Sequence, residues 1–184
     1  MKKLLIAATL LACSTAALAE GPYIGGTIGS ARSKLDCAGT DSCNNNSTAV
    51  KGFVGYSFND MFSMEGTYYD LGKASASVSG ANVDLKTTGY GLRGLVAVPF
   101  NKDFSGFAAL GINRMKSKAS VNSGSFSGST DSTSTKPSVA VGVDYALSPM
   151  LKVRGEVESM RVDAPASSGS YNISTVSVGL KYQF

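Results

Sequence analysis

Charged and apolar side chains alternate between Met150 and Arg161. One face of this segment carries both signs of charge, on Lys152, Arg154, Glu156 and Glu158. Two carboxylates two residues apart could act as a general acid and a general base. They could also form a ladder of ion pairs with the cations beside them. Because cations and carboxylates share one face, we favour the charge ladder.

Histidine is absent from the sequence. Its pKa suits proton transfer near neutral pH, so it is the commonest catalytic base. The serines are scattered through polar stretches with no base beside them. We therefore expect no enzymatic activity and no cofactor.

Two cysteines, Cys37 and Cys43, enclose a short Ala-Gly-Thr-Asp-Ser segment in a polar stretch. An even pair of cysteines suits a disulfide in an oxidising compartment. We predict a disulfide between them that staples a surface loop. Metal binding and redox sensing are the alternatives, although a metal site would require more ligands.

The first nineteen residues have the pattern of an export signal. Lys2 and Lys3 precede an apolar run over residues 4–12, and Ala17-Leu18-Ala19 offers a small-x-small cleavage site. The pattern predicts a signal peptide over residues 1–19 and a mature chain over residues 20–184. In the alternative interpretation, residues 10–13 form a lipobox and Cys13 is acylated. A membrane anchor is excluded by length, because a spanning helix needs about 20 apolar residues.

The remaining 165 residues suit a single domain. Without Lys2 and Lys3, the 17 basic residues become 15, against 13 acidic ones. No basic cluster of the kind that follows nucleic-acid phosphates appears along the sequence. We therefore expect no nucleic-acid partner.

Eight segments alternate apolar residues with polar or small ones, which predicts β-strands. They cover residues 23–33, 48–58, 61–71, 83–98, 104–115, 137–147, 150–161 and 171–184. Short turns at 59–60, 99–103 and 148–149 alternate with long polar connections at 34–47, 72–82, 116–136 and 162–170. Short turns at one end and long loops at the other are typical of outer-membrane barrels.

The last predicted strand shows which face is apolar. One of its faces consists of Val176, Val178, Leu180, Tyr182 and Phe184, and the other is polar or small. Residues 50–58 and 139–147 repeat this pattern. An eight-stranded barrel leaves room inside only for side chains. A polar face that includes both signs of charge therefore indicates a membrane barrel, whose apolar band faces the lipid. Aromatic residues gather near the strand ends, as interfacial belts require.

Several stretches resemble a known family. Residues 142–149, Gly-Val-Asp-Tyr-Ala-Leu-Ser-Pro, together with Arg154-Gly155-Glu156, resemble a hairpin of the OmpA transmembrane barrel. The closing residues 178–184 resemble OmpA-like and opacity-type surface proteins. The resemblance implies an all-β fold, an eight-stranded antiparallel up-and-down transmembrane β-barrel. It places the protein in the outer membrane, with extracellular loops and periplasmic termini.

The resemblance also assigns roles to single residues. Four inward charges match the interior salt-bridge gate of the OmpA barrel, namely Glu65, Arg93, Asp144 and Arg154. We expect Lys51, Glu156, Glu158 and Lys181 to extend this network. The network either rigidifies the interior or gates ions. The C-terminal aromatic strand implies an assembly signal for the barrel-assembly machinery, formed by Leu180, Tyr182 and Phe184. Alternatively, Phe184 serves only as an interface anchor.

Two classes of function follow. The first is a structural or surface-interaction protein in contact with outer-membrane lipids and, through its loops, with host surface molecules in adhesion or immune contact. The second is a small, low-conductance porin-like channel with the salt-bridge gate in its lumen. The Ser-, Gly- and Thr-rich residues 116–136 predict a solvated spacer or an adhesive surface. Composition does not choose between these two interpretations.

Overall fold

The computed structural model describes residues 20–33, 42–44, 46–78, 81–123, 126–163 and 170–184. These residues form nine strands: β1 (Gly21–Ser33), β2 (Ser42–Asn44), β3 (Asn46–Ser57), β4 (Phe62–Val78), β5 (Ala81–Pro99), β6 (Phe104–Ser123), β7 (Phe126–Ala146), β8 (Leu151–Asp163) and β9 (Ser170–Gln183). Within the described residues, no helix is long and apolar enough to cross a membrane.

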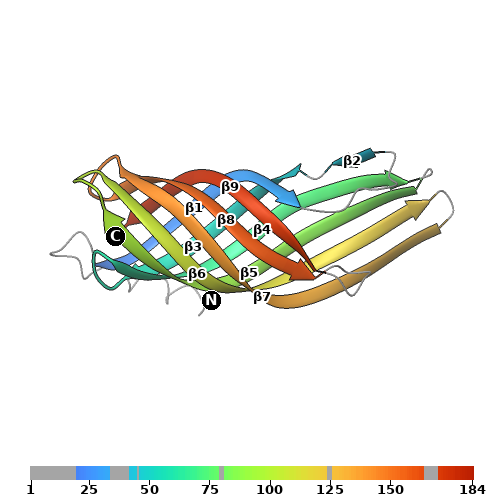
Figure 1. Cartoon of the computed structure of the whole chain (residues 1–184), viewed down its shortest axis with the longest axis horizontal. Helices are drawn as coiled ribbons and strands as arrows, with labels where there is room; N and C mark the ends of the chain where they lie inside the picture. The colour runs from blue at the N-terminus through green and yellow to red at the C-terminus, as the bar shows by residue number, and fades with distance from the viewer. Residues whose placement is uncertain (1–19, 34–41, 45, 79–80, 124–125, 164–169) are drawn as a thin grey trace, which may run out of the picture.

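Every strand except β2 belongs to a closed antiparallel barrel (Figure 1). Neighbouring strands follow the order of the chain, β9 pairs with β1, and the pairing of β4 with β5 completes the circle. Closure pairs the backbone of the wall with itself and removes the sheet edges, which a strand protein needs in lipid. The eight-stranded up-and-down barrel predicted from the sequence is confirmed.

The outer face of the wall is apolar, because the side chains of a strand alternate between its two faces. Leu110 and Ile112 are 71% and 63% exposed, and their neighbours in sequence point inward. The apolar faces predicted at residues 50–58, 139–147 and 176–184 all lie on this outer side. The apolar band of a membrane barrel is therefore present.

The three short turns lie at one end of the barrel, which we call the short-turn end. The side-chain oxygen of Asn59 accepts hydrogen bonds from the backbone N–H groups of Met61 and Phe62, at 2.9 and 2.7 Å. Asn101 caps the next turn in the same way. Such asparagine turns close a hairpin without a long loop. The predicted turns at 59–60, 99–103 and 148–149 are confirmed.

At the opposite end, β4 to β7 are longer than predicted and project beyond the other strands (Figure 1). The ladder between β6 and β7 continues from Lys116 opposite Thr133 to Ser123 opposite Phe126. The prediction of loops over residues 72–82 and 116–136 is therefore wrong for most of their length. Polar composition predicts a loop, but threonine has a high strand propensity and also suits a solvated strand. We call this end the long-strand end.

A bulge lies in β4 where its pairing with β3 ends and its pairing with β5 continues. The register between β4 and β5 shifts between Asp70 and Lys73. Gly72 lies there with φ of +70°, and its N–H donates to the Asp70 carboxylate at 3.0 Å. A Cβ at this position would come within 2.5 Å of the Thr48 carbonyl oxygen, so only glycine fits. The bulge changes the course of the strand without breaking the barrel.

Candidate functional site

The lumen holds a network of charged side chains. Glu65, Arg93, Asp144 and Arg154 come from β4, β5, β7 and β8, and all are buried. Glu65 lies directly opposite Arg93 in the β4–β5 ladder, and Asp144 lies directly opposite Arg154 in the β7–β8 ladder. The pairing of the strands thus places a carboxylate beside each guanidinium, whatever rotamers the side chains adopt.

Arg154 binds two carboxylates. Its Nε and Nη2 donate to the two oxygens of Asp144 at 2.8 and 2.9 Å, and its Nη1 donates to Glu65 at 2.6 Å. The planar fork of arginine is suited to this arrangement. The guanidinium carbon also lies 4.9 Å from the ring centre of Phe53 and 4.4 Å from that of Phe107. Two cation–π contacts therefore hold the position of Arg154.

The two rings rest on glycines of the neighbouring strands. Phe53 lies opposite Gly25 in the β1–β3 ladder, and Phe107 lies opposite Gly142 in the β6–β7 ladder. A Cβ on Gly25 would approach Phe53 to 2.3 Å, and one on Gly142 would approach Phe107 to 2.5 Å. These glycines make room for the rings, which in turn cover the exposed glycine backbone.

Arg93 connects the network to the other side of the lumen. Its Nε donates to Glu65 at 2.7 Å, and its two Nη atoms each donate to Glu156 at 2.9 Å. Glu65 is therefore shared by both arginines. The hydroxyl of Tyr23 also donates to Glu65, at 3.0 Å. Arg93, Glu65 and Glu156 are thus paired and hydrogen-bonded, as the burial of charge requires.

Lys51 and Glu158 extend the network toward the long-strand end. The Lys51 ammonium donates to Glu156 and, at 3.2 Å, to Glu158. The hydroxyl of Tyr69 donates to Glu158 at 2.8 Å. Lys181 contacts the network through a ring, since its Nζ lies 3.8 Å from the centre of Tyr23. The structure thus brings the eight predicted lumen residues together, seven through ion pairs and Lys181 through Tyr23. Whether they gate ions stays a prediction.

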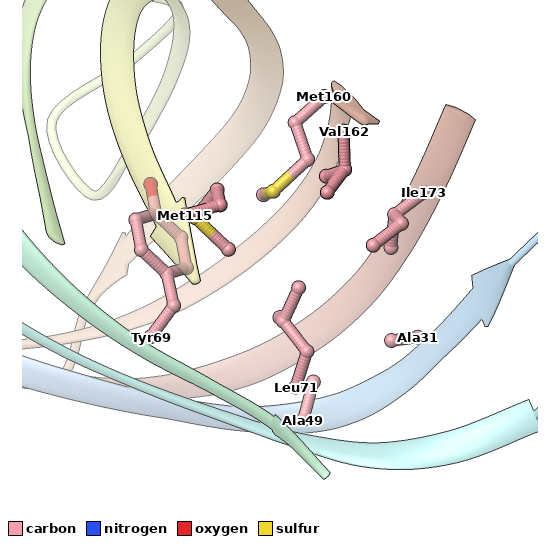
Figure 2. Packing of buried hydrophobic residues seen from close by; sticks show 8 residues of the cluster. All are labelled: Ala31, Ala49, Tyr69, Leu71, Met115, Met160, Val162 and Ile173. Atoms are coloured by element: carbon pink, nitrogen blue, oxygen red, sulfur yellow. The ribbon is translucent and has the colours of Figure 1, made fainter. Parts of the chain in front are cut away.

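A cluster of buried apolar side chains points into the lumen on the long-strand side of the network (Figure 2). We call it the apolar plug, and it consists of Ala31, Ala49, Tyr69, Leu71, Met115, Met160, Val162 and Ile173. All eight are at most 4% exposed, and their side chains converge from different strands. The sequence interpretation missed this layer. The sequence does contain a signal for it. Several of these residues continue the inward-facing alternation at the ends of the predicted strands.

Two cavities border the network. One of about 70 Å³ lies at the short-turn end and is lined by Asp144, Lys152 and Lys181, among others. The second, of about 10 Å³, lies beside Lys51 and Glu158. A cavity of the second size holds about one water molecule. Charged side chains of the network line both cavities, Asp144 and Lys181 the first and Lys51 and Glu158 the second. Among the described residues, no three histidine, cysteine, aspartate or glutamate side chains group as a metal site.

Several predicted residues lie outside this network. Leu180, Tyr182 and Phe184 face outward on β9 and beyond its end, and the rings of Tyr182 and Phe184 lie 5.2 Å apart. Their role as an assembly signal stays a prediction. Cys37, the Cys43 side chain, and residues 1–19 with Cys13 are outside the described part of the structure. The disulfide and the signal peptide therefore stay predictions.

Comparison with known proteins agrees with this geometry. The family description "Outer membrane protein beta-barrel domain" matches residues 5–184. No curated protein sequence matches the chain. Neisserial surface protein A is 15% identical with a TM-score of 0.66, and the match covers 89% of this chain and 97% of that one.

Two other solved structures are similar. Ail, the attachment invasion locus protein of Yersinia pestis, solved with the heparin analogue sucrose octasulfate, is 19% identical with a TM-score of 0.60 over 90% of this chain and 99% of that one. The N-terminal barrel domain of Pseudomonas aeruginosa OprF is 10% identical with a TM-score of 0.52 over 89% and 98%. At these identities the structures show the fold alone. With its family match over nearly the whole sequence, the chain belongs to the outer membrane protein β-barrel family and is an outer-membrane protein.

Proposed function

We propose that this protein is a closed barrel that acts at its outer surface, as a structural or surface-interaction protein. In this proposal the long-strand end faces the exterior of the cell and the termini face the periplasm. The filled lumen carries the proposal. The charged network ties opposite walls together, and the apolar plug fills the next layer. Such an interior supports rigidity better than transport.

The projecting part of β4 to β7 supports a role in surface contact. Its strands remain paired well beyond the apolar band, so the backbone is ordered before any partner binds. An ordered surface loses less conformational entropy on binding than a flexible loop does. Its serine, threonine and lysine side chains offer many hydrogen-bond donors. We infer that host surface molecules bind this projecting sheet.

A polyanionic glycan is the first ligand to test. Ail, which shares the fold, was solved with a heparin analogue. In this chain, Lys116 and Lys118 lie on exposed positions of the projecting β6. Exposed ammonium groups attract the negatively charged sulfate groups of such a glycan, and this attraction weakens as the salt concentration rises.

The test shortens the projecting hairpin of β6 and β7 without changing which residues of the two strands pair. Because Lys118 lies opposite Asp131, residues 119–130 can be replaced by an Asn-Gly turn, which closes a two-residue hairpin. We expect this variant to fold normally, as measured by heat-modifiable migration in gels. It should lose most binding to cultured cells but keep binding to immobilised heparin, because Lys116 and Lys118 remain. Heparin binding should instead be lost when both lysines are replaced by glutamine. A control in which residues 119–130 keep their length and composition in shuffled order should retain binding if the projecting sheet itself is the surface. Full binding of cultured cells by the shortened hairpin would contradict the proposal.

The channel is the second candidate, and the ion-pair network favours it. Arginine–carboxylate pairs in a lumen can open by exchanging partners, and Glu65 already binds two arginines. In that account the network is the gate. The apolar plug weighs against it, because a second barrier would remain after the ion pairs opened. Single-channel currents in planar bilayers distinguish the closed barrel from the channel.

A further inference from the structure

The polar cavity of about 70 Å³ at the short-turn end has room for a small ligand. Every strand from β3 to β9 contributes to its lining, and so does the turn at residues 59–61. One buried water needs about 10–15 Å³, so the cavity can hold a group of about five heavy atoms. Asn59 and Asp60 in its lining are exposed, so solutes reach it from this end. The charges that line the cavity decide which solute it binds.

Two lysines of the lining lie side by side. Lys152 and Lys181 are directly opposite each other in the β8–β9 ladder, and both line the cavity. Side chains in such a position begin about 5 Å apart on the same face, and like charges there destabilise a sheet. Lys181 is only 7% exposed, so bulk water screens its charge poorly. An anion between the two ammonium groups removes this repulsion.

Another buried lysine of the lumen shows how such a charge is stabilised. Lys51 forms ion pairs with Glu156 and Glu158. In the described part of the barrel, neither Lys152 nor Lys181 forms an ion pair of this kind. The Lys181 ammonium does lie against a ring, 3.8 Å from the centre of Tyr23, which stabilises the cation on one side. An ammonium group has three donors, so others are available to a ligand in the cavity.

The carboxylates around the cavity do not neutralise the two lysines. Asp144 lines the cavity, but its two oxygens accept hydrogen bonds from Arg154 at 2.8 and 2.9 Å. Glu65 lies beyond the Tyr23 ring and binds both arginines of the network. Asp60 lies on the exposed turn and, among the described residues, takes part in no ion pair. Two lysines therefore share the cavity with one unpaired carboxylate, and positive charge is in excess.

We propose that this cavity binds a small oxyanion, phosphate or sulfate, between the ammonium groups of Lys152 and Lys181. Two ammonium groups match the double negative charge of these ions, and lysine binds phosphate as a point charge. The hydroxyl groups of Ser57 and Ser105 belong to the same lining and can donate to further oxygens. This site lies inside the lumen and is independent of the proposed surface role.

A phosphate group can come from solution or from a lipid headgroup. The outer face of the barrel is apolar, whereas the cavity lies on the inner face, so a headgroup would have to leave the lipid boundary to reach it. The ligand of the proposal is therefore the free ion.

The test is calorimetric titration of the refolded barrel in a maltoside detergent, which contains no phosphate. Sodium phosphate, sodium sulfate, sodium chloride and dihexanoyl phosphatidylglycerol, a soluble short-chain lipid, are titrated separately at constant pH and ionic strength. We expect one site that binds phosphate and sulfate more tightly than chloride or the lipid. Each lysine donates a charge-assisted hydrogen bond, so K152Q and K181Q should each weaken phosphate binding at least about tenfold. K152R, which keeps the charge, should retain binding.

The same end of the barrel offers matched controls. Lys102 is an exposed lysine outside the cavity lining, so K102Q should change phosphate binding less than about twofold. D60N removes the unpaired carboxylate and should tighten binding about two- to fivefold. D103N removes an exposed carboxylate outside the lining and should leave binding unchanged. Heat-modifiable migration in gels verifies the folding of each variant.

Several results would overturn the proposal. Failure of wild type to bind phosphate, or unchanged binding in K152Q, would show that the cavity is no anion site. An equal loss in K102Q would assign binding to net charge. Equal affinity for chloride would deny selectivity for an oxyanion, and equal affinity for the short-chain lipid would make the headgroup the ligand. If the buried change K181Q prevents folding, the loss in K152Q and its recovery in K152R decide the outcome.

Discussion

The lumen has two layers that are built from opposite chemistry. The charged network joins Glu65, Arg93, Asp144 and Arg154 through directional bonds, each of which requires a particular partner. The apolar plug places Met115 and Met160 in a cluster whose only hydroxyl, that of Tyr69, donates to Glu158 in the network. The network is specific but intolerant of deletion, whereas the plug excludes water and tolerates similar shapes. We expect a barrel that uses both to be rigid and closed to ions.

The largest expected effect is the loss of one network partner. R154A leaves Asp144 and one oxygen of Glu65 buried without their guanidinium. Removing one partner of a buried ion pair costs about 3 to 5 kcal/mol. We expect a loss of this size in the free energy of unfolding, measured by denaturant titration in lipid vesicles. The exposed R114A should lose less than about 1 kcal/mol.

A double-mutant cycle extends this comparison. Replacing Arg154 by Met and Asp144 by Leu removes both the guanidinium and its bidentate carboxylate. The double variant should lose less stability than the sum of the two single variants, because each single change strands the partner. Additive losses would show that Arg154 and Asp144 act independently, contrary to their 2.8 Å contact.

A smaller effect is expected in the apolar plug. M115A removes a side chain that is 0% exposed. Truncation of a buried methionine costs about 2 to 5 kcal/mol, and the lower part of this range applies where neighbours can relax. We expect about 2 to 3 kcal/mol in the same denaturant titration. M115L should restore nearly full stability, since it keeps the volume. A loss in M115L as large as in M115A would show that the plug needs a specific shape.

The smallest effect lies on the surface. The Lys116 ammonium, 2.7 Å from Asp131, lowers the pKa of that carboxyl group. A lowered pKa in the folded state stabilises the protein above the ordinary aspartate pKa, and the benefit disappears as pH falls through the lowered value. Because the pair is exposed, K116Q should raise the pKa of Asp131 toward its ordinary value without a measurable change in unfolding. Carboxyl NMR titration provides the readout, and an unmoved pKa would contradict the pairing.

Period-two alternation predicts much of the fold and the lumen. It places Glu65, Arg93, Asp144 and Arg154 on inward positions, because burial on one face fixes the phase of each strand. It does not predict that Glu65 is shared by two arginines, since that depends on the register of several strands and on side-chain rotamers. Tyr23 and Tyr69 were missed as partners of Glu65 and Glu158 for the same reason.

Two other features were missed for different reasons. The apolar plug is assembled from residues far apart in the sequence, and each contributing strand supplies only one or two of them. The projecting parts of β6 and β7 are polar on both faces, so hydrophobic periodicity does not reveal them. Their pairing continues from the strand register established in the membrane. Sequence patterns therefore predict the membrane band better than the parts above it.

The central claim is that the apolar plug closes the lumen, and single-channel currents in planar bilayers test it most directly. Three refolded barrels are compared after their folding has been verified: residues 20–184 of wild type, R154A, and the combination M115S with M160S. We predict silent bilayers for wild type and R154A, and discrete current steps only when the plug is made polar and can take up water. Steps in wild type that R154A alters, with no effect of the methionine changes, would place the gate in the charged network and contradict this account.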